Sequence, residues 1–159
     1  MNKKKIYIVG GAVLAILIVA GAVWGPDYFI FYKNEYLQNK YLKEFAALED
    51  AYRQDKNGGD TPEETLEMLV TALEKGDAGA AANLFVPEKR KEMKKQFTAG
   101  LKSGGVELFL LSVKNNKLEG IVLDNGYRYQ IIDDDDDEVI LSVDFTFNER
   151  SNRWLIESL

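Results

Sequence analysis

The sequence predicts an α+β protein in which amphipathic helices precede an antiparallel sheet. Three features of this 159-residue chain lead to that fold class. Apolar residues recur at helical spacing between residues 61 and 101, whereas apolar and polar residues alternate between residues 139 and 148. Ahead of both regions, residues 6–24 run without a charged side chain. We therefore expect a membrane helix near the N-terminus, followed by one α+β domain.

The first expected element is a transmembrane helix at residues 6–24, IYIVGGAVLAILIVAGAVW, behind a cationic tail at residues 1–5. As a helix, its nineteen residues span about 28 Å, close to the thickness of the bilayer hydrocarbon. The tail holds three Lys and the next cation is Lys33, so the N-terminus is expected in the cytoplasm and the domain outside. Ile6 and Trp24 bound the anchor. The alternative is a cleavable secretory signal that ends near residues 20–22, AGA.

The composition restricts the chemistry of the exported domain. The chain has no Cys and no His, which excludes disulfides, thiol nucleophiles and a lipid on Cys, and removes the commonest general base. We expect no cofactor. Without the three Lys of the tail, 17 cations stand against 26 acids, a formal charge of −9. This balance argues against nucleic acid as a partner, because binding it requires many Lys and Arg.

Residues 25–55 are expected to form a juxtamembrane stalk helix. Gly25-Pro26 ends or kinks the membrane helix, and an aromatic collar at the membrane surface follows: Tyr28, Phe29, Phe31 and Tyr32. One apolar face then recurs in steps of 4, 4, 3 and 4: Leu37, Tyr41, Phe45, Leu48 and Tyr52. This face packs on the following domain, pairs with a second copy or lies on the membrane. Residues 56–60, KNGGD, are expected to be a flexible linker.

The domain at residues 61–159 is expected to open with three helices. Asp60 or Thr61 caps the first helix, Pro62 takes its first helical position, and Gly76 stops it. Asp77 caps a second, short helix that ends at residues 86–87, Val-Pro. The third helix is expected from residue 88 to about residue 101, with a narrow buried face: Met93, Phe97 and Leu101.

Strands are expected after the Gly pair at residues 104–105. The segments are residues 106–113, 118–124, 127–132, 138–148 and 153–158. The fourth of these alternates most clearly, with one apolar face: Val139, Leu141, Val143, Phe145 and Phe147. Asn125-Gly126 is expected to form a type I′ hairpin turn, because both residues tolerate positive φ.

Two stretches carry a resemblance to a known family. The segment TPEETLEMLVTALEKGDAGAAANLFVPEKRKEMKKQF resembles the helical opening of the nuclear transport factor 2-like (cystatin-like α+β) superfamily, especially its bacterial envelope members of unknown function. The ending VDFTFNERSNRWLIESL is similar to the last hairpin of that family, where Trp154 would close the core. The resemblance covers residues 60–159.

The resemblance implies a strongly bent sheet wrapped around helices, with a cone-shaped pocket at its open end. Family members use this pocket for isomerase, dehydratase or hydrolase chemistry, or leave it filled and use the sheet for protein contacts. Several members sit outside the membrane behind one N-terminal helix. They include scaffold subunits of type IV secretion machinery and the leading domains of some cell-wall synthesis enzymes. These matching topologies favour a non-catalytic function.

The acidic run at residues 133–138 is the most conspicuous polar feature. Asp133, Asp135 and Asp137 resemble part of a calcium loop, but the glycine for the sharp turn and the bidentate Glu at position twelve are missing. The alternative is a solvated hairpin loop whose like charges oppose aggregation at the strand ends. The incomplete pattern favours the loop.

A basic cluster on the third expected helix is the second polar feature: Lys89, Arg90, Lys91, Lys94 and Lys95. In an acidic domain, this cluster would contact an anionic wall polymer, lipid headgroups or an acidic partner surface. The simpler interpretation is a solvent-facing side of the helix, with Glu88 and Glu92 as ion-pair partners one turn away.

An enzymatic pocket would need a carboxylate whose pKa is raised by burial, together with a hydrogen-bond donor. Asp144 is the best carboxylate because it lies inside a strand, and Tyr127 and Tyr129 are the candidate donors. Asp144 nevertheless falls on the polar face of its strand, and the tyrosines fit a half-buried sheet equally well. The His-containing dyads of the family cannot be built from this chain.

The sequence therefore favours a non-catalytic domain that binds or scaffolds other components of the bacterial cell envelope. The expected partners are the lipid bilayer and either envelope proteins or a second copy, with a small-molecule ligand as a further option. One alternative is a scaffold subunit of secretion or conjugation machinery. The other is a small-molecule enzyme of the isomerase or dehydratase type that uses the cone pocket.

Overall fold

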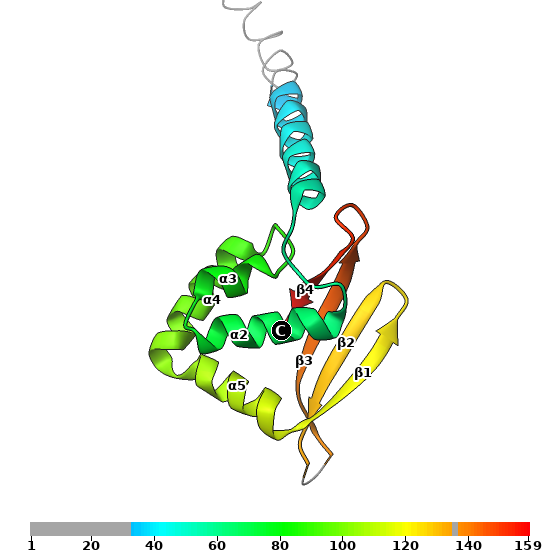
Figure 1. Ribbon diagram of the computed structural model, residues 1–159. Helices are drawn as coiled ribbons and strands as arrows, with labels where there is room; N and C mark the ends of the chain where they lie inside the picture. The colour runs from blue at the N-terminus through cyan, green and yellow to red at the C-terminus, as the bar shows by residue number, and fades with distance from the viewer. Residues whose placement is uncertain (1–32, 135–136) are drawn as a thin grey trace, which may run out of the picture. The chain divides into compact units, whose positions relative to one another are not determined.

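The computed structural model describes residues 33–134 and 137–159. This part of the protein is α+β, with helices followed by a four-stranded antiparallel sheet of order β1-β2-β3-β4 (Figure 1). The chain divides into two compact units between Ala47 and Leu48. The predicted membrane helix at residues 6–24 and the aromatic collar lie outside the described residues. Among the residues that are described, no helix is both long and apolar enough to cross a bilayer.

The stalk is helical over residues 33–54. In the first unit, Tyr41 and Phe45 of its predicted apolar face are 66% and 63% exposed. Leu48 and Tyr52 belong to the second unit and are half-buried. Packing on the domain therefore accounts for the C-terminal end of this face.

Three of the helices begin and end close to the predicted residues. α2 (Pro62–Glu74) has Pro62 at its start, and the Thr61 hydroxyl accepts a hydrogen bond of 3.1 Å from the Glu64 amide. α3 (Ala78–Asn83) is capped by Asp77, whose carboxylate accepts a hydrogen bond of 2.8 Å from the Ala80 amide. α4 (Arg90–Ser103) buries Phe97, whereas Leu101 is 36% exposed. The caps were predictable because they depend on residues only three apart.

The expected strand at residues 106–113 is wrong: this segment lies in a helix, α5 (Gly105–Asn115). Gly104 has a φ of 81° and separates α4 from α5. The two helices pack closely, since a Cβ on Gly100 would lie 3.0 Å from a Val106 methyl. The helical period was present in the sequence, with apolar residues at i, i+3, i+4 and i+7: Val106, Phe109, Leu110 and Val113.

The other four predicted strands are confirmed as β1 (Lys117–Leu123), β2 (Gly126–Ile132), β3 (Val139–Asn148) and β4 (Arg153–Ser158). The predicted type I′ turn is wrong. Leu123 pairs with Gly126, so Asp124 and Asn125 form the turn, and neither Asn125 nor Gly126 has a positive φ. A glycine is needed at position 126 for a different reason: there is no room for a side chain, because a Cβ there would lie 2.3 Å from the Phe145 carbonyl oxygen.

The core lies between the helices and one face of the sheet (Figure 1). Trp154 packs against this core, as expected from the last hairpin, and its ring centroid is 5.3 Å from that of Phe147. The most deeply buried members come from α2, α3, α4, β3, β4 and the segment after α3: Leu66, Leu69, Leu73, Ala81, Ala82, Leu84, Phe85, Phe97, Val143, Phe145 and Ile156.

The predicted flexible linker at residues 56–60 is wrong, because this segment is packed along β4. The Trp154 amide donates a 2.9 Å hydrogen bond to the Gly59 carbonyl. The Gly59 amide donates a hydrogen bond of 2.9 Å to the hydroxyl of Thr65, which is buried. The same hydroxyl lies 3.0 Å from the Trp154 carbonyl oxygen. Gly58 has a φ of 87°, and a Cβ there would lie 2.1 Å from the same Trp154 oxygen. These contacts cover half of the outer edge of β4.

The other half of that edge is covered by the chain after α3. The Ile156 amide donates a hydrogen bond of 2.9 Å to the Leu84 carbonyl, and the Val86 amide donates one of 3.0 Å to the Ile156 carbonyl. At the opposite side of the sheet, β1 pairs with β2 alone among the described residues. Within the described residues, the sheet thus has one covered edge and one free edge.

Candidate functional site

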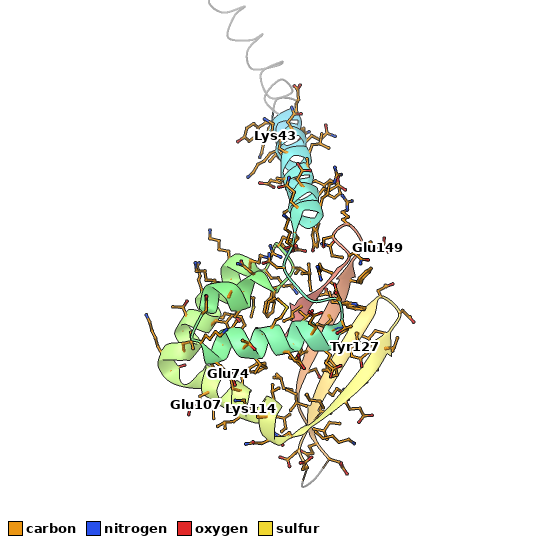
Figure 2. All side chains as sticks on the ribbon, in the orientation of Figure 1. Lys43, Glu74, Glu107, Lys114, Tyr127 and Glu149 are labelled. Carbon is orange, nitrogen blue, oxygen red and sulfur yellow. The ribbon has the colours of Figure 1, made fainter. Side chains whose placement is uncertain are left out.

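The three residues proposed for a catalytic pocket lie on opposite faces of the sheet. Tyr127 and Tyr129 pair with core residues Phe145 and Val143, so both tyrosines are on the helix-covered face. Arg128, between them, is opposite Asp144 on the other face. Figure 2 shows Tyr127 on β2. Asp144 therefore cannot act with either tyrosine on one bound molecule.

The two tyrosines form an aromatic pair over the start of the sheet. Their ring centroids are 5.0 Å apart at an interplanar angle of 67°, and Tyr129 makes a second edge contact with Phe145 at 5.9 Å. The Tyr127 hydroxyl occupies the place of a side chain on Gly120, since a Cβ there would lie 1.8 Å from it. A glycine at this position of β1 therefore leaves room for the tyrosine.

Tyr129 is held in its protonated form. Burial, the hydrogen bond with Tyr127 and the negative charges nearby, including Glu63, raise the pKa of Tyr129 to about 12. A phenol with this pKa donates hydrogen bonds at neutral pH and is a poor proton acceptor. Tyr129 is thus suited to orient a ligand rather than to abstract a proton.

A hollow of about 580 Å³ lies beside Tyr129, between α2, α5 and β1. Most of its walls are apolar, and the polar groups at its surface are Tyr129, Thr71 and two carboxylates of α2: Glu63 and Glu67. Its lining fits a small molecule with an apolar body.

Asp144 is engaged in a stable ion pair on the other face. Arg128 donates from Nε at 2.5 Å and from Nη2 at 3.1 Å, and the Ser158 hydroxyl donates at 2.9 Å. Hydrogen bonding from Arg128 is the main cause that lowers the pKa of Asp144 below its usual range. The pKa of Arg128 is raised by the same contact. A catalytic acid needs the opposite shift, so Asp144 is a structural residue of the β2–β3 pair.

The acidic run connects β2 to β3. The Asp133 amide donates a hydrogen bond of 2.8 Å to the Glu138 carbonyl, and the Asp137 amide donates one of 3.1 Å to the Asp133 carbonyl. Asp137 has a φ of 56°. Asp135, the middle residue of the calcium hypothesis, lies outside the described residues, so the hypothesis remains a prediction. Within residues 33–134 and 137–159, no group of three or more acidic side chains has a geometry that could hold a metal ion.

The basic cluster divides into two parts. The Lys89 ammonium donates a hydrogen bond of 2.6 Å to the Glu157 carbonyl. Arg90 donates a hydrogen bond to the Phe85 carbonyl and forms an ion pair with Asp55. These two cations stabilise the domain. The remaining three are exposed on α4 and line a shallow surface groove with Lys102: Lys91, Lys94 and Lys95.

The polar contacts at the junction between the stalk helix and the domain were missed in the sequence. The Tyr52 hydroxyl donates to both Glu88 oxygens at 2.9 and 3.0 Å, and the Asn148 amide group donates 2.8 Å to the Tyr52 carbonyl. Burial and the contact with Glu88 raise the pKa of Tyr52. Glu49 also forms an ion pair with Arg150. The apolar face of the stalk predicted that Tyr52 packs on the domain, and the only signal of the polar contacts was an Asp just after the helix.

That residue, Asp55, is the centre of the junction. Its side chain is fully buried and forms the ion pair with Arg90, whose side chain is 22% exposed. The second carboxylate oxygen accepts hydrogen bonds of 3.0 and 2.7 Å from the amide and side chain of Asn57. Residues 48–60 are therefore an ordered part of the domain.

Comparison of the chain with protein-family models, with curated proteins and with solved structures finds no match.

Proposed function

We propose that this protein is a single-pass membrane protein whose C-terminal domain binds or scaffolds other components of the bacterial cell envelope, outside the cytoplasm, without catalysing a reaction. The expected anchor is the uncharged run at residues 6–24. The observation that carries the proposal is the ordered junction at residues 48–60, which joins the stalk helix to the domain through the buried Asp55. A binding domain benefits from such a junction because the end of the stalk helix, from Leu48 onward, is built into the domain itself.

The fold we propose within the α+β class is the nuclear transport factor 2-like cone. Two observations support it: helices α2 to α5 pack on one face of an antiparallel sheet, and Trp154 of the last strand packs against the core. In this proposal, the hollow beside Tyr129 is the pocket of the cone.

A non-catalytic function is supported by the state of the candidate residues. Asp144 is held ionised by Arg128 on the face away from the hollow, and Tyr129 is held protonated. The hollow favours a small-molecule ligand as a second candidate, in which case Tyr129 would orient the ligand. A scaffold subunit of secretion or conjugation machinery remains the more specific form of the first proposal.

The anchor and orientation are testable by labelling single cysteines, because the natural chain has none. We would compare Glu107→Cys, at an exposed position of α5, with Asn2→Cys in the tail. A membrane-impermeant maleimide should label Glu107→Cys in spheroplasts and label Asn2→Cys only after lysis. The protein should also remain in the membrane fraction after a carbonate wash.

Three outcomes would overturn the proposal. The reverse labelling pattern would place the domain in the cytoplasm. A soluble product that begins near Val23 would identify a cleaved signal. Turnover of a small molecule that is lost in Tyr129→Phe and retained in Val122→Thr would identify an enzyme.

A further inference from the structure

The free edge of the sheet, β1, exposes apolar side chains beside unpaired backbone groups. Leu118, Val122 and Leu123 are 40%, 82% and 37% exposed. Every second residue of β1 turns its N–H and C=O away from β2, and no strand of the described chain meets them. Such an edge is a template for pairing with another strand.

Of the usual devices that protect a free edge, β1 has only charged side chains at its start. Protected edges carry Pro, an inward charge or a bulge, or are covered by another segment, as β4 is here. β1 contains no Pro and pairs with β2 without a register shift. Its two charged residues, Lys117 and Glu119, are at its start, and their charged groups lie 3.9 Å apart. The last four residues, GIVL, are uncharged.

We propose that β1 pairs antiparallel with β1 of a second copy of this chain, about a two-fold axis at Gly120. This register places Leu118 of each copy opposite Val122 of the other. Val122, the most exposed apolar residue of the edge, is therefore covered in both copies. It also uses all seven residues of β1. The two sheets become one continuous sheet of eight strands, with the helices of both copies on the same face.

Neighbouring registers are less favourable. A two-fold axis at Glu119 would put two Glu carboxylates directly opposite each other, which is destabilising. An axis at Ile121 would put Leu118 opposite Asp124. A shift of the pairing by a single residue would place the helices of the two copies on opposite faces of the joined sheet. In the Gly120 register, the two Glu119 carboxylates are diagonal neighbours, and each keeps its own Lys117 nearby.

Gly120 and Tyr127 make the centre of the pair accessible. No side chain projects from Gly120, and the Tyr127 hydroxyl of the same copy fills the space above it. Two glycines therefore meet at the axis without a steric conflict, and the two Tyr127 rings flank them. This arrangement is complementary to a second copy rather than to an arbitrary peptide, because the same residues supply both sides. The inference depends on β1 alone and is independent of the membrane anchor.

Disulfide trapping in the full-length protein tests both the dimer and its register. In the Gly120 register, residues 118 and 122 of different copies have Cα atoms about 4.5–5.5 Å apart, within disulfide range. In one copy they are about 13 Å apart, too far for a disulfide. The double variant Leu118→Cys with Val122→Cys should therefore give a covalent dimer with mild oxidant in native membranes. Each single variant should give almost none.

A charge on the edge gives a second readout. Val122→Lys should convert the detergent-solubilised protein from dimer to monomer, measured by light scattering after size exclusion. The matched control is Leu108→Lys on α5, where the native side chain is 67% exposed and away from β1; it should remain dimeric. Circular dichroism would verify that both variants are folded.

Three results would overturn the inference. A monomeric natural protein without trapping in the double variant would show that β1 is unpaired. Equal trapping in the single variants would show a different register. A dimer that survives Val122→Lys and gives no disulfide in the double variant would assign self-association to the stalk helix.

Discussion

The two edges of the sheet differ in what covers them. The outer edge of β4 is bonded to Gly59 on one half and to Leu84 and Val86 on the other. The outer edge of β1 meets no strand within the described part of the chain and exposes Val122. The covered edge is therefore an intramolecular interface that stabilises the domain. The free edge contributes little to the monomer and is available for association.

The largest expected effect tests whether the cover on β4 stabilises the fold. Gly58→Ala would force a Cβ to 2.1 Å from the Trp154 oxygen at a φ of 87°. We expect a loss of about 3–4 kcal/mol in the free energy of unfolding, because steric overlap adds to left-handed strain. Urea denaturation would measure it. The control Gly76→Ala has a φ of 68° and no neighbour within 4 Å, and should lose only about 1 kcal/mol.

The second test concerns the residue that holds the covering segment to the domain. Asp55→Ala would leave Arg90 without its partner and Asn57 without its acceptor. We expect a loss of about 3 kcal/mol, since the Asp55 side chain is fully buried. Glu74→Ala, which removes an exposed ion pair with Lys114, should cost less than about 1 kcal/mol. Equal losses in thermal unfolding would contradict the assigned role of Asp55.

A third test addresses the hydroxyl that connects the cover to α2. Thr65→Val keeps the side-chain volume but leaves the buried Gly59 amide without its acceptor. The expected loss is about 2 kcal/mol, the cost of an unsatisfied buried polar group. Thr98→Val, at an exposed hydroxyl on α4, is the matched control and should change stability by less than about 0.5 kcal/mol. A neutral Thr65→Val would mean that water replaces the hydroxyl.

The smallest expected effect lies between the two edges, at the Arg128–Asp144 pair. The folded pKa of Asp144 is below the unfolded value of about 3.9, so its stabilisation is full above that pH and is lost as the pH falls through the folded pKa. Asp144→Asn should therefore destabilise the protein more at pH 7 than at pH 2. Denaturation at both values would measure this difference. A variant equally destabilised at both would indicate packing rather than charge.

Much of the fold was predictable because its signals are local. The caps at Thr61 and Asp77 and the alternation in β3 involve residues a few positions apart. α5 was mistaken for a strand because its apolar run is short and follows two glycines, and a short apolar run suits either element. The turn at Asp124 and Asn125 was misplaced by one residue, since Gly126 is needed for a contact with β3 rather than for a turn.

The candidate site was predictable only in part. Tyr127 and Tyr129 were correctly placed on one half-buried face, because alternation along a strand fixes the face of each residue. The partner of Asp144 could not be identified, since strand pairing brings Arg128 to it from sixteen residues away. The basic cluster divided for the same reason: Asp55 binds Arg90 from thirty-five residues away.

The sequence by itself determined the kinds of element, their caps and the charge and apolar patterns, because these depend on neighbouring residues. Only the tertiary structure decided that KNGGD is a packed cover rather than a linker, and that β1 rather than β4 is the free edge. The physical reason is that the Gly59–Trp154 contact joins backbone groups, which every residue carries. Backbone groups leave no signature in a sequence until the fold brings them together.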